Sequence, residues 1–264
     1  MGYEIRFPNG LAKAVTFSFD DGKISDRRLA QLFNKYNVKA TFHLNSGKFG
    51  QDDYISSDEV NSLYNGHEVS CHTVSHPFPS SLTGSQMMSE LTDDRKNLEA
   101  LAGYPVRGLS YPYGEYFDEF INTAVSSGLE YSRTVQSTYG FALPSDFMKW
   151  HPTCHQSEAD KLVDRFFEKD EHLRIKLFYI WGHSYEFDRD NTWDYMENVL
   201  KELSSKDNVW YATNIEIKDY LTAARNLISS LDGTMLCNRY ALPVYIESSG
   251  QIIKINPGET VTIK

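Results

Sequence analysis

Residues 16–22 read TFSFDDG, and the interpretation of the whole chain starts from this stretch. Small, β-branched and aromatic residues lead into it, which predicts a strand that enters the core. The strand ends in two adjacent carboxylates, Asp20 and Asp21. Consecutive strand residues point to opposite faces, so both carboxylates can reach one pocket only if the chain leaves strand geometry, and Gly22 allows such a turn. Two adjacent anions repel unless a cation or a shared proton relieves them. The stretch therefore predicts either a cation site or a solvated turn.

Composition limits the classes of function. The chain has 264 residues, 41% of them hydrophobic, which is enough for one domain of α/β barrel size or for two smaller domains. A net charge of −10 argues against a nucleic-acid partner, because that binding depends on Lys and Arg. Three cysteines (Cys71, Cys154 and Cys237) are too few for a disulfide framework. The many aromatic residues suit stacking on sugars.

Hydrophobic runs are short, so we expect no transmembrane segment. The N-terminal residues have neither an apolar core region nor a small-residue cleavage site of a signal peptide. We expect the protein to be cytoplasmic, or exported with its signal peptide absent from this sequence. The sequence leaves the oligomeric state open.

Expected strands and helices alternate along nearly the whole chain, which predicts parallel pairing. Strands are expected at 14–19, 39–44, 68–71, 106–111, 129–135, 173–181 and 208–212. Helices are expected at 26–36, 83–102, 117–127, 158–167, 192–205 and 216–227, with a short one after Ser56 and irregular chain at 136–157. The prediction is a distorted (β/α)7-type barrel over residues 1–230, followed by a small antiparallel β extension over 231–264.

His72 and His76 follow the strand at 68–71 and are four residues apart. On a helical turn this spacing places two imidazoles on one face, within reach of one metal. Thr73 stands where the HExxH metalloprotease pattern has Glu, which excludes that class. A lone histidine pair is more often incidental. Parallel α/β folds, however, gather strand ends on one face, where Asp20 and Asp21 would supply carboxylates beside it.

Four motifs, taken in order, resemble the polysaccharide deacetylase family, the NodB-homology domain of carbohydrate esterase family 4. TFSFDDG resembles the family's TFDDG, and HTVSH resembles H[ST]xxH. YPYG at 111–114 resembles part of RxPYG, and a hydrophobic strand that ends in GHSYEF at 182–187 resembles the last motif. The resemblance implies the barrel and a metal-dependent polysaccharide deacetylase, with a carbohydrate as its substrate.

The resemblance also implies roles for single residues. Asp20 would be the general base, and Asp21, His72 and His76 would hold a divalent metal. Zn²⁺ is the first expectation, with Co²⁺, Ni²⁺ or Mn²⁺ as alternatives. Three protein ligands leave positions for water and the substrate carbonyl.

Acid catalysis and substrate contacts come from later motifs. The resemblance implies that His183 protonates the departing amine and that the backbone N–H of Tyr113 stabilises the oxyanion. A satisfied histidine at a buried strand end is the structural alternative for His183. Residues expected to contact the sugar are Pro112, Tyr113, Trp181 and Tyr185, with Trp150 as a further candidate.

The chain departs from the family pattern in two places. Ser110 stands where RxPYG has Arg, so we expect a raised pKa for Asp20 unless Arg133 or Arg107 reaches it. The fourth motif, which supplies an Asp and a Trp near the catalytic histidine, has no clean match. The segment near Trp150 contains a possible second zinc set, but it has no neighbouring fourth ligand, which favours an ordinary loop; that set is His151, Cys154 and His155.

The resulting prediction is a hydrolase that removes acetyl groups from N-acetylated, or alternatively O-acetylated, oligo- or polysaccharides. One alternative is a small-molecule amidohydrolase of the same fold. Another is a catalytically weak carbohydrate-binding domain, which the presence of both a base and an acid argues against.

Overall fold

The structure is a computed structural model that describes residues 2–170, 172 and 174–263. Met1, Glu171, Leu173 and Lys264 lie outside the described residues. The expected strand at 173–181 therefore starts outside them, and its described part is β8 (Lys176–His183).

A parallel sheet occupies the centre of the molecule. Its hydrogen-bonded order is β6-β5-β4-β3-β2-β8-β7, and β9 pairs with the first half of β2. Every pairing within this sheet is parallel, as the alternation of elements predicts. The remaining bounds are β2 (Lys13–Asp21), β3 (Ala40–Leu44), β4 (Glu68–Cys71), β5 (Gly108–Ser110), β6 (Tyr131–Arg133), β7 (Cys154–His155) and β9 (Val209–Tyr211).

The sheet curls into a barrel that is closed through Trp150. The backbone N–H of Trp150 donates to the carbonyl of Ser132 on β6, and the N–H of Thr134 donates to the carbonyl of Trp150. Four residues later, β7 pairs with β8. The distorted barrel is thus confirmed, with seven strands along its path and an eighth, β9, beside β2 among the described residues. The stretch 136–157, expected to be wholly irregular, contains the short segment that completes the barrel.

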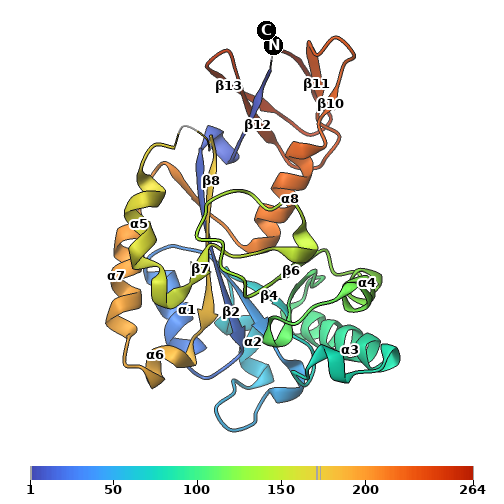
Figure 1. Ribbon diagram of the computed structural model, residues 1–264, viewed down its shortest axis with the longest axis vertical. Coiled ribbons are helices and arrows are strands. Elements are labelled where there is room, and N and C mark those ends of the chain that lie inside the picture. The colour runs from blue at the N-terminus through green and yellow to red at the C-terminus, as the bar shows by residue number, and fades with distance from the viewer. Residues whose placement is uncertain (1, 171, 173, 264) are drawn as a thin grey trace.

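Helices cover the outside of the barrel in two groups (Figure 1). One group lies beside β8 and the other beside β4, with α8 between the barrel and the small sheets. The bounds are α1 (Asp26–Lys35), α2 (Val60–Leu63), α3 (Gly84–Ala102), α4 (Asp118–Ser126), α5 (Asp160–Phe167), α6 (Tyr185–Arg189), α7 (Trp193–Leu203) and α8 (Asn214–Arg225). The helix α6 was not predicted from the sequence. No helix in the described part of the chain is long and apolar enough to cross a membrane.

The core forms where β2 meets α1. Phe17 and Phe19 lie on β2, and both pack against Phe33 of α1, with ring centroids 4.9 and 5.7 Å apart. Leu29, one turn earlier, is also fully buried, so α1 presents a continuous apolar stripe to the sheet. This packing anchors the strand that ends in Asp20 and Asp21.

Two small antiparallel sheets follow the barrel. One has the order β1-β12-β13 and the other β10-β11-β14. Their strands are β1 (Glu4–Arg6), β10 (Ile228–Ser229), β11 (Met235–Cys237), β12 (Val244–Ser248), β13 (Gln251–Ile255) and β14 (Thr260–Thr262). The N-terminal strand therefore pairs with the C-terminal region, and both termini lie at the same end (Figure 1). The division at residue 230 stays a prediction.

Replacing Trp150 with Ala should strongly destabilise the barrel. Its side chain is 1% exposed and packs edge-on against Tyr131, Phe147 and Tyr179. Truncating a buried aromatic residue typically costs about 3–5 kcal/mol in the free energy of unfolding. Urea unfolding followed by circular dichroism measures this loss. Leu231→Ala is the matched control, because Leu231 is fully exposed and should change stability by less than about 0.5 kcal/mol. Equal effects of the two substitutions would contradict the closure through Trp150.

Candidate active site

The predicted site residues meet at the carboxyl edge of the sheet. In the strand register, Asp20 lies opposite His43 of β3 on one side and His183 of β8 on the other. Most of the predicted site residues border a cavity of about 520 Å³. Its lining residues are Asp20, Asp21, His72, His76, Tyr111, Tyr113, Gly114, Val135, Trp181, His183 and Tyr185.

The two carboxylates reach one cavity because the backbone turns at Asp21. Asp21 has φ +82° and Gly22 has φ +69°, so the departure from strand geometry begins one residue before the glycine. Left-handed φ is uncommon for residues other than glycine, and such residues cluster at functional sites. Thr73, His76 and Tyr113 around the same cavity share this conformation, with φ between +57° and +67°.

His72 and His76 converge without a helix. They lie in a loop after β4, where the N–H of His76 donates to Thr73 Oγ1 at 3.2 Å. The expectation of a helical turn was wrong. The positive φ of Thr73 folds the loop back instead, and the two imidazole centroids are 4.6 Å apart.

Asp21, His72 and His76 fit a divalent metal. Asp21 Oδ1 lies 3.7 Å from His72 Nε2 and 3.8 Å from His76 Nε2. Ligands about 2.0–2.2 Å from a tetrahedral zinc are roughly 3.3–3.6 Å from one another, so a small contraction would close the site. His72 Nδ1 lies 2.8 Å from the carbonyl of Ser110, which leaves Nε2 as the nitrogen with the free lone pair. Burial lowers the pKa of His72 to about 3, which keeps the ring neutral.

Arg133, one of the two arginines considered from the sequence, supplies the cation that Ser110 cannot. Its guanidinium, fully buried, forms an ion pair with Asp20 Oδ2, and its Nε donates to Ser18 Oγ at 3.1 Å. The Ser110 hydroxyl donates to Asp20 Oδ1 at 3.0 Å. Burial alone would raise the pKa of Asp20, but Arg133 and the neighbouring histidines bring it well below its usual range. The exception stated for Arg133 therefore applies, and the pKa of Asp20 is not raised. Arg107 does not take part, because it pairs with Glu130 and Asp219.

The neighbouring carboxylate is in a different environment. Burial raises the pKa of Asp21, and the charge of Asp20 raises it further against the opposing effects of His183 and His76. A cation bound at Asp21 would relieve this repulsion. Asp20, already paired with Arg133, needs no such partner. The geometry thus separates one carboxylate suited to a metal from one held ionised beside it.

Two other buried carboxyl groups hold the loops of the site, and neither was recognised from the sequence. Asp94 of α3 accepts from the N–H of His72 at 3.0 Å and from the N–H of Ser46 at 2.9 Å. Asp26 of α1 accepts from Tyr64 at 2.7 Å and from the hydroxyl of Ser184, the residue after His183. Burial raises the pKa of each to about 7.

The predicted sugar contacts are only partly at the cavity. Tyr113, Trp181 and Tyr185 line it. Pro112 is buried and is not among the lining residues, and Trp150 lies in the core. The sequence did not indicate a further exposed ring beside the cavity. This ring is Phe78, which stacks on Tyr113 with centroids 3.7 Å apart.

The possible second zinc set does not assemble. His151 Nδ1 lies 2.6 Å from Thr134 Oγ1, and Cys154 is buried. His155 turns instead toward Glu186, 3.0 Å away. The three cysteines are free.

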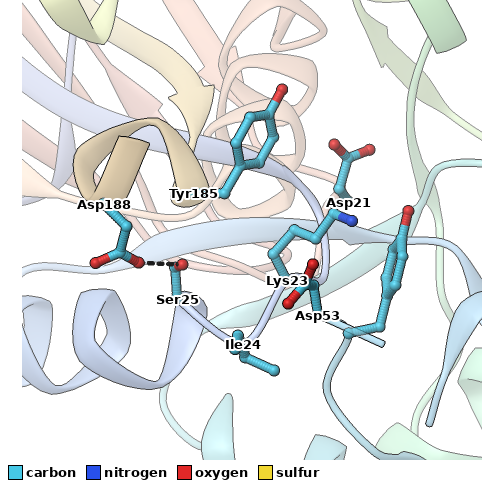
Figure 2. A pocket seen from close by; sticks show the side chains of 8 residues that line it. Asp21, Lys23, Ile24, Ser25, Asp53, Tyr185 and Asp188 are labelled. Carbon is cyan, nitrogen blue, oxygen red and sulfur yellow. Dashed lines mark hydrogen bonds between the residues drawn. The ribbon is translucent and has the colours of Figure 1, made fainter. Parts of the chain in front are cut away.

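A second cavity of about 520 Å³ adjoins the first, and Asp21 and Tyr185 border both. Figure 2 shows Lys23, Asp53 and the hydrogen-bonded pair Ser25 and Asp188 around it. The Lys23 ammonium lies 3.6 Å from the centre of the Tyr54 ring. The space beside Asp21 thus extends from the first cavity into a second one with polar lining residues.

Replacing His72 or His76 with Ala should abolish stoichiometric binding of one divalent cation. Each substitution removes one of three ligands, and two ligands hold zinc poorly. Elemental analysis after dialysis against Zn²⁺ measures the occupancy. His151→Ala is the control and should retain one equivalent. Full occupancy in both ligand variants would contradict the assignment.

Replacing Arg133 with Met should destabilise the protein by about 3–5 kcal/mol, because Asp20 is left buried without its partner. Asp20→Asn likewise leaves Arg133 buried without its partner and should also destabilise the protein. The double variant should lose less than the sum of the two single losses. The stabilising effect of the low pKa of Asp20 is present at neutral pH and is lost as the pH falls below about 4. Urea unfolding of the metal-free proteins tests this, and additive losses would contradict the pairing.

The chain is similar to known proteins in both sequence and structure. The family model described as polysaccharide deacetylase matches residues 8–132. YxkH of Bacillus subtilis, a candidate polysaccharide deacetylase, is 26% identical over 126 residues, which are 47% of this chain and 45% of that protein. The match thus spans less than half of that relative's length.

Two solved structures share the fold. A candidate polysaccharide deacetylase from Mycobacterium smegmatis aligns with a TM-score of 0.64 and 16% identity over 85% of this chain and 95% of that one. A carbohydrate esterase family 4 pseudoenzyme from Bacillus anthracis aligns with a TM-score of 0.51 and 20% identity over 80% of this chain and 66% of that one. At these identities the likeness concerns the fold alone. The resemblance to the polysaccharide deacetylase family is thereby confirmed over residues 8–132, the segment that holds Asp20, Asp21, His72 and His76.

Proposed function

We propose that this protein is a metal-dependent hydrolase that removes acetyl groups from N-acetylated oligo- or polysaccharides, with O-acetylated sugars as the alternative substrate. The observation that carries the proposal is the meeting of an ionised carboxylate, a metal-type ligand set and a histidine at one cavity. These three parts perform distinct tasks in amide hydrolysis.

Asp21, His72 and His76 would hold the metal. A divalent metal, Zn²⁺ foremost, lowers the pKa of a bound water and polarises the acetyl carbonyl. His72 and His76 would present Nε2, and the contact of His72 Nδ1 with Ser110 fixes the orientation of the first ring.

Asp20 would take one proton from the attacking water. Its pairing with Arg133 and Ser110 holds the carboxylate in place and ionised. The water oxygen bonds to the acetyl carbon, and the backbone N–H of Tyr113 would donate to the carbonyl oxygen as it becomes negative.

His183 would protonate the leaving nitrogen. As the C–N bond breaks, its electron pair stays on nitrogen, which accepts the imidazolium proton, and acetate is released. Burial opposes the charged form of His183, but Glu186, Asp20 and Asp21 together raise its pKa. This favours the protonated ring that the step requires.

The shape of the site supports a sugar chain over a small cyclic amide. Tyr113 and Phe78 form a stacked pair at the cavity and are 53% and 54% exposed. Exposed aromatic faces suit sugar rings. The adjoining polar cavity gives a chain room on the other side of Asp21.

The solved pseudoenzyme of this fold makes binding without catalysis the second candidate. Acetate release from N-acetylated chitooligosaccharides and from acetylated xylan, measured with added Zn²⁺, separates the candidates. We expect release from the former. Metal-loaded, folded protein that releases no acetate from either would leave only a binding function.

Asp20→Asn should retain the metal and lose at least about 10²-fold in kcat, because a general base is removed from an otherwise assembled site. Metal analysis and acetate release are measured on the same preparation, and circular dichroism confirms the fold. Asp21→Asn should instead lose the metal. Full activity of Asp20→Asn in excess Zn²⁺ would contradict this division of roles.

A further inference from the structure

We propose that Glu186 is a positioning residue for His183, held in place by His155 and Gln156. The inference rests on the proposed function, in which His183 protonates the leaving amine. It concerns a cluster of three residues that do not line the cavity themselves, Glu186, His155 and Gln156.

Glu186 reaches His183 because a helix begins directly after β8. His183 is the last residue of that strand, and Glu186 lies one turn later in α6. Glu186 Oε1 is 3.4 Å from His183 Nδ1. That nitrogen is buried and makes no hydrogen bond to any part of the chain that the structure describes. The contact is long for a hydrogen bond, and such contacts at catalytic groups commonly tighten when substrate binds.

The other oxygen of Glu186 is fixed by two groups. Gln156 Nε2 donates to Oε2 at 2.8 Å, and His155 Nε2 lies 3.0 Å from the same atom. Gln156 Nε2 also donates to the backbone carbonyl of His183 at 3.1 Å, so one buried amide joins the carboxylate to the histidine. Gly182 makes room for it, because a Cβ there would lie 2.4 Å from the Gln156 side chain. Oε1 is thus the oxygen available to His183.

The residue types would also suit a metal, since nitrogen and oxygen atoms of His155, His183 and Glu186 lie within 4.8 Å of one another. The hydrogen bonds of His155 argue against a metal and favour a hydrogen bond between His155 and Glu186. The backbone N–H of Ser157 points at His155 Nδ1 at 3.4 Å, and the Ser157 hydroxyl lies 2.9 Å from the same nitrogen. With Nδ1 as the acceptor of both, the proton of the neutral ring is on Nε2, where it faces Glu186. A metal ligand must lack that proton.

The charges around the cluster are consistent with an ionised Glu186 that orients the His183 ring. Arg189 Nη2 lies 3.9 Å from Glu186 Oε1. On the cavity side, the charges of Asp20 and Asp21 raise the pKa of His183. With Glu186 beside Nδ1, that nitrogen carries a proton in the neutral ring, and Nε2 is left for the cavity and the leaving amine.

Glu186→Gln should lower kcat for acetamide substrates by about 10- to 100-fold, with KM little changed. Hydrolysis of 4-nitrophenyl acetate should change far less, because nitrophenolate leaves without a proton. Glu186→Asp should restore part of the loss. Glu197→Gln, which alters a surface pair with Lys35, is the control and should behave as wild type.

A double-mutant cycle tests whether Glu186 acts through His183. Adding Glu186→Gln to His183→Ala should cause no further loss, because the group it positions is already gone. Equal losses on both substrates, or a further loss in the His183→Ala background, would overturn the inference.

A measurement without turnover separates this inference from the proposed function. In ¹⁵N spectra of the imidazole nitrogens, neutral His183, assigned with His183→Gln, should carry its proton on Nδ1 in the wild type and become a mixture in Glu186→Gln. Unchanged tautomers would overturn the positioning role whether or not the protein is a deacetylase. Zn²⁺ titration of His72→Ala is the last test. If this variant still binds one equivalent of Zn²⁺, and adding His155→Gln abolishes that binding, the cluster holds a metal and the positioning role is overturned.

Discussion

The site depends on one electrostatic constraint, which is that two adjacent carboxylates end a buried strand. Asp20 is 2% exposed, and a lone ion at such a position costs several kcal/mol. The fold meets this cost with Arg133, which comes from β6 on the far side of the barrel. Closing the barrel near Trp150 is therefore what brings the guanidinium to the carboxylate. Asp21, which has no such partner, faces two histidines instead.

Around this pair the backbone is held in conformations that residues other than glycine rarely adopt. The positive φ values of Asp21, Thr73, His76 and Tyr113 each cost free energy, on the order of 1–3 kcal/mol. Buried hydrogen bonds offset this cost, notably those that Asp94 accepts from the backbone of His72 and Ser46. Because Asp94 belongs to α3, which packs on the barrel, these hydrogen bonds anchor the loop that carries His72.

The sequence predicted the barrel well, because strands covered on both faces read as short apolar runs and alternate with amphipathic helices. It also predicted which residues meet, since parallel strands share one carboxyl edge. It named Arg133 and Arg107 as alternative partners of Asp20 without deciding between them, and it did not predict Glu186 beside His183. Those contacts depend on how the barrel closes and on where α6 begins, and no local pattern encodes either. For the loop that carries His72 and His76, the sequence predicted structure that is not there, because the spacing of the two histidines suits a helical turn that the chain does not form.

The central claim is that the two carboxylates have separate partners, a metal for Asp21 and Arg133 for Asp20. Anomalous diffraction at the zinc absorption edge, from crystals grown with Zn²⁺, tests it most directly. The account predicts one strong peak about 2.0–2.2 Å from Asp21, His72 Nε2 and His76 Nε2, with Asp20 still paired to Arg133. A peak coordinated by Asp20 in place of Asp21, or one only at His155 and Glu186, would contradict it.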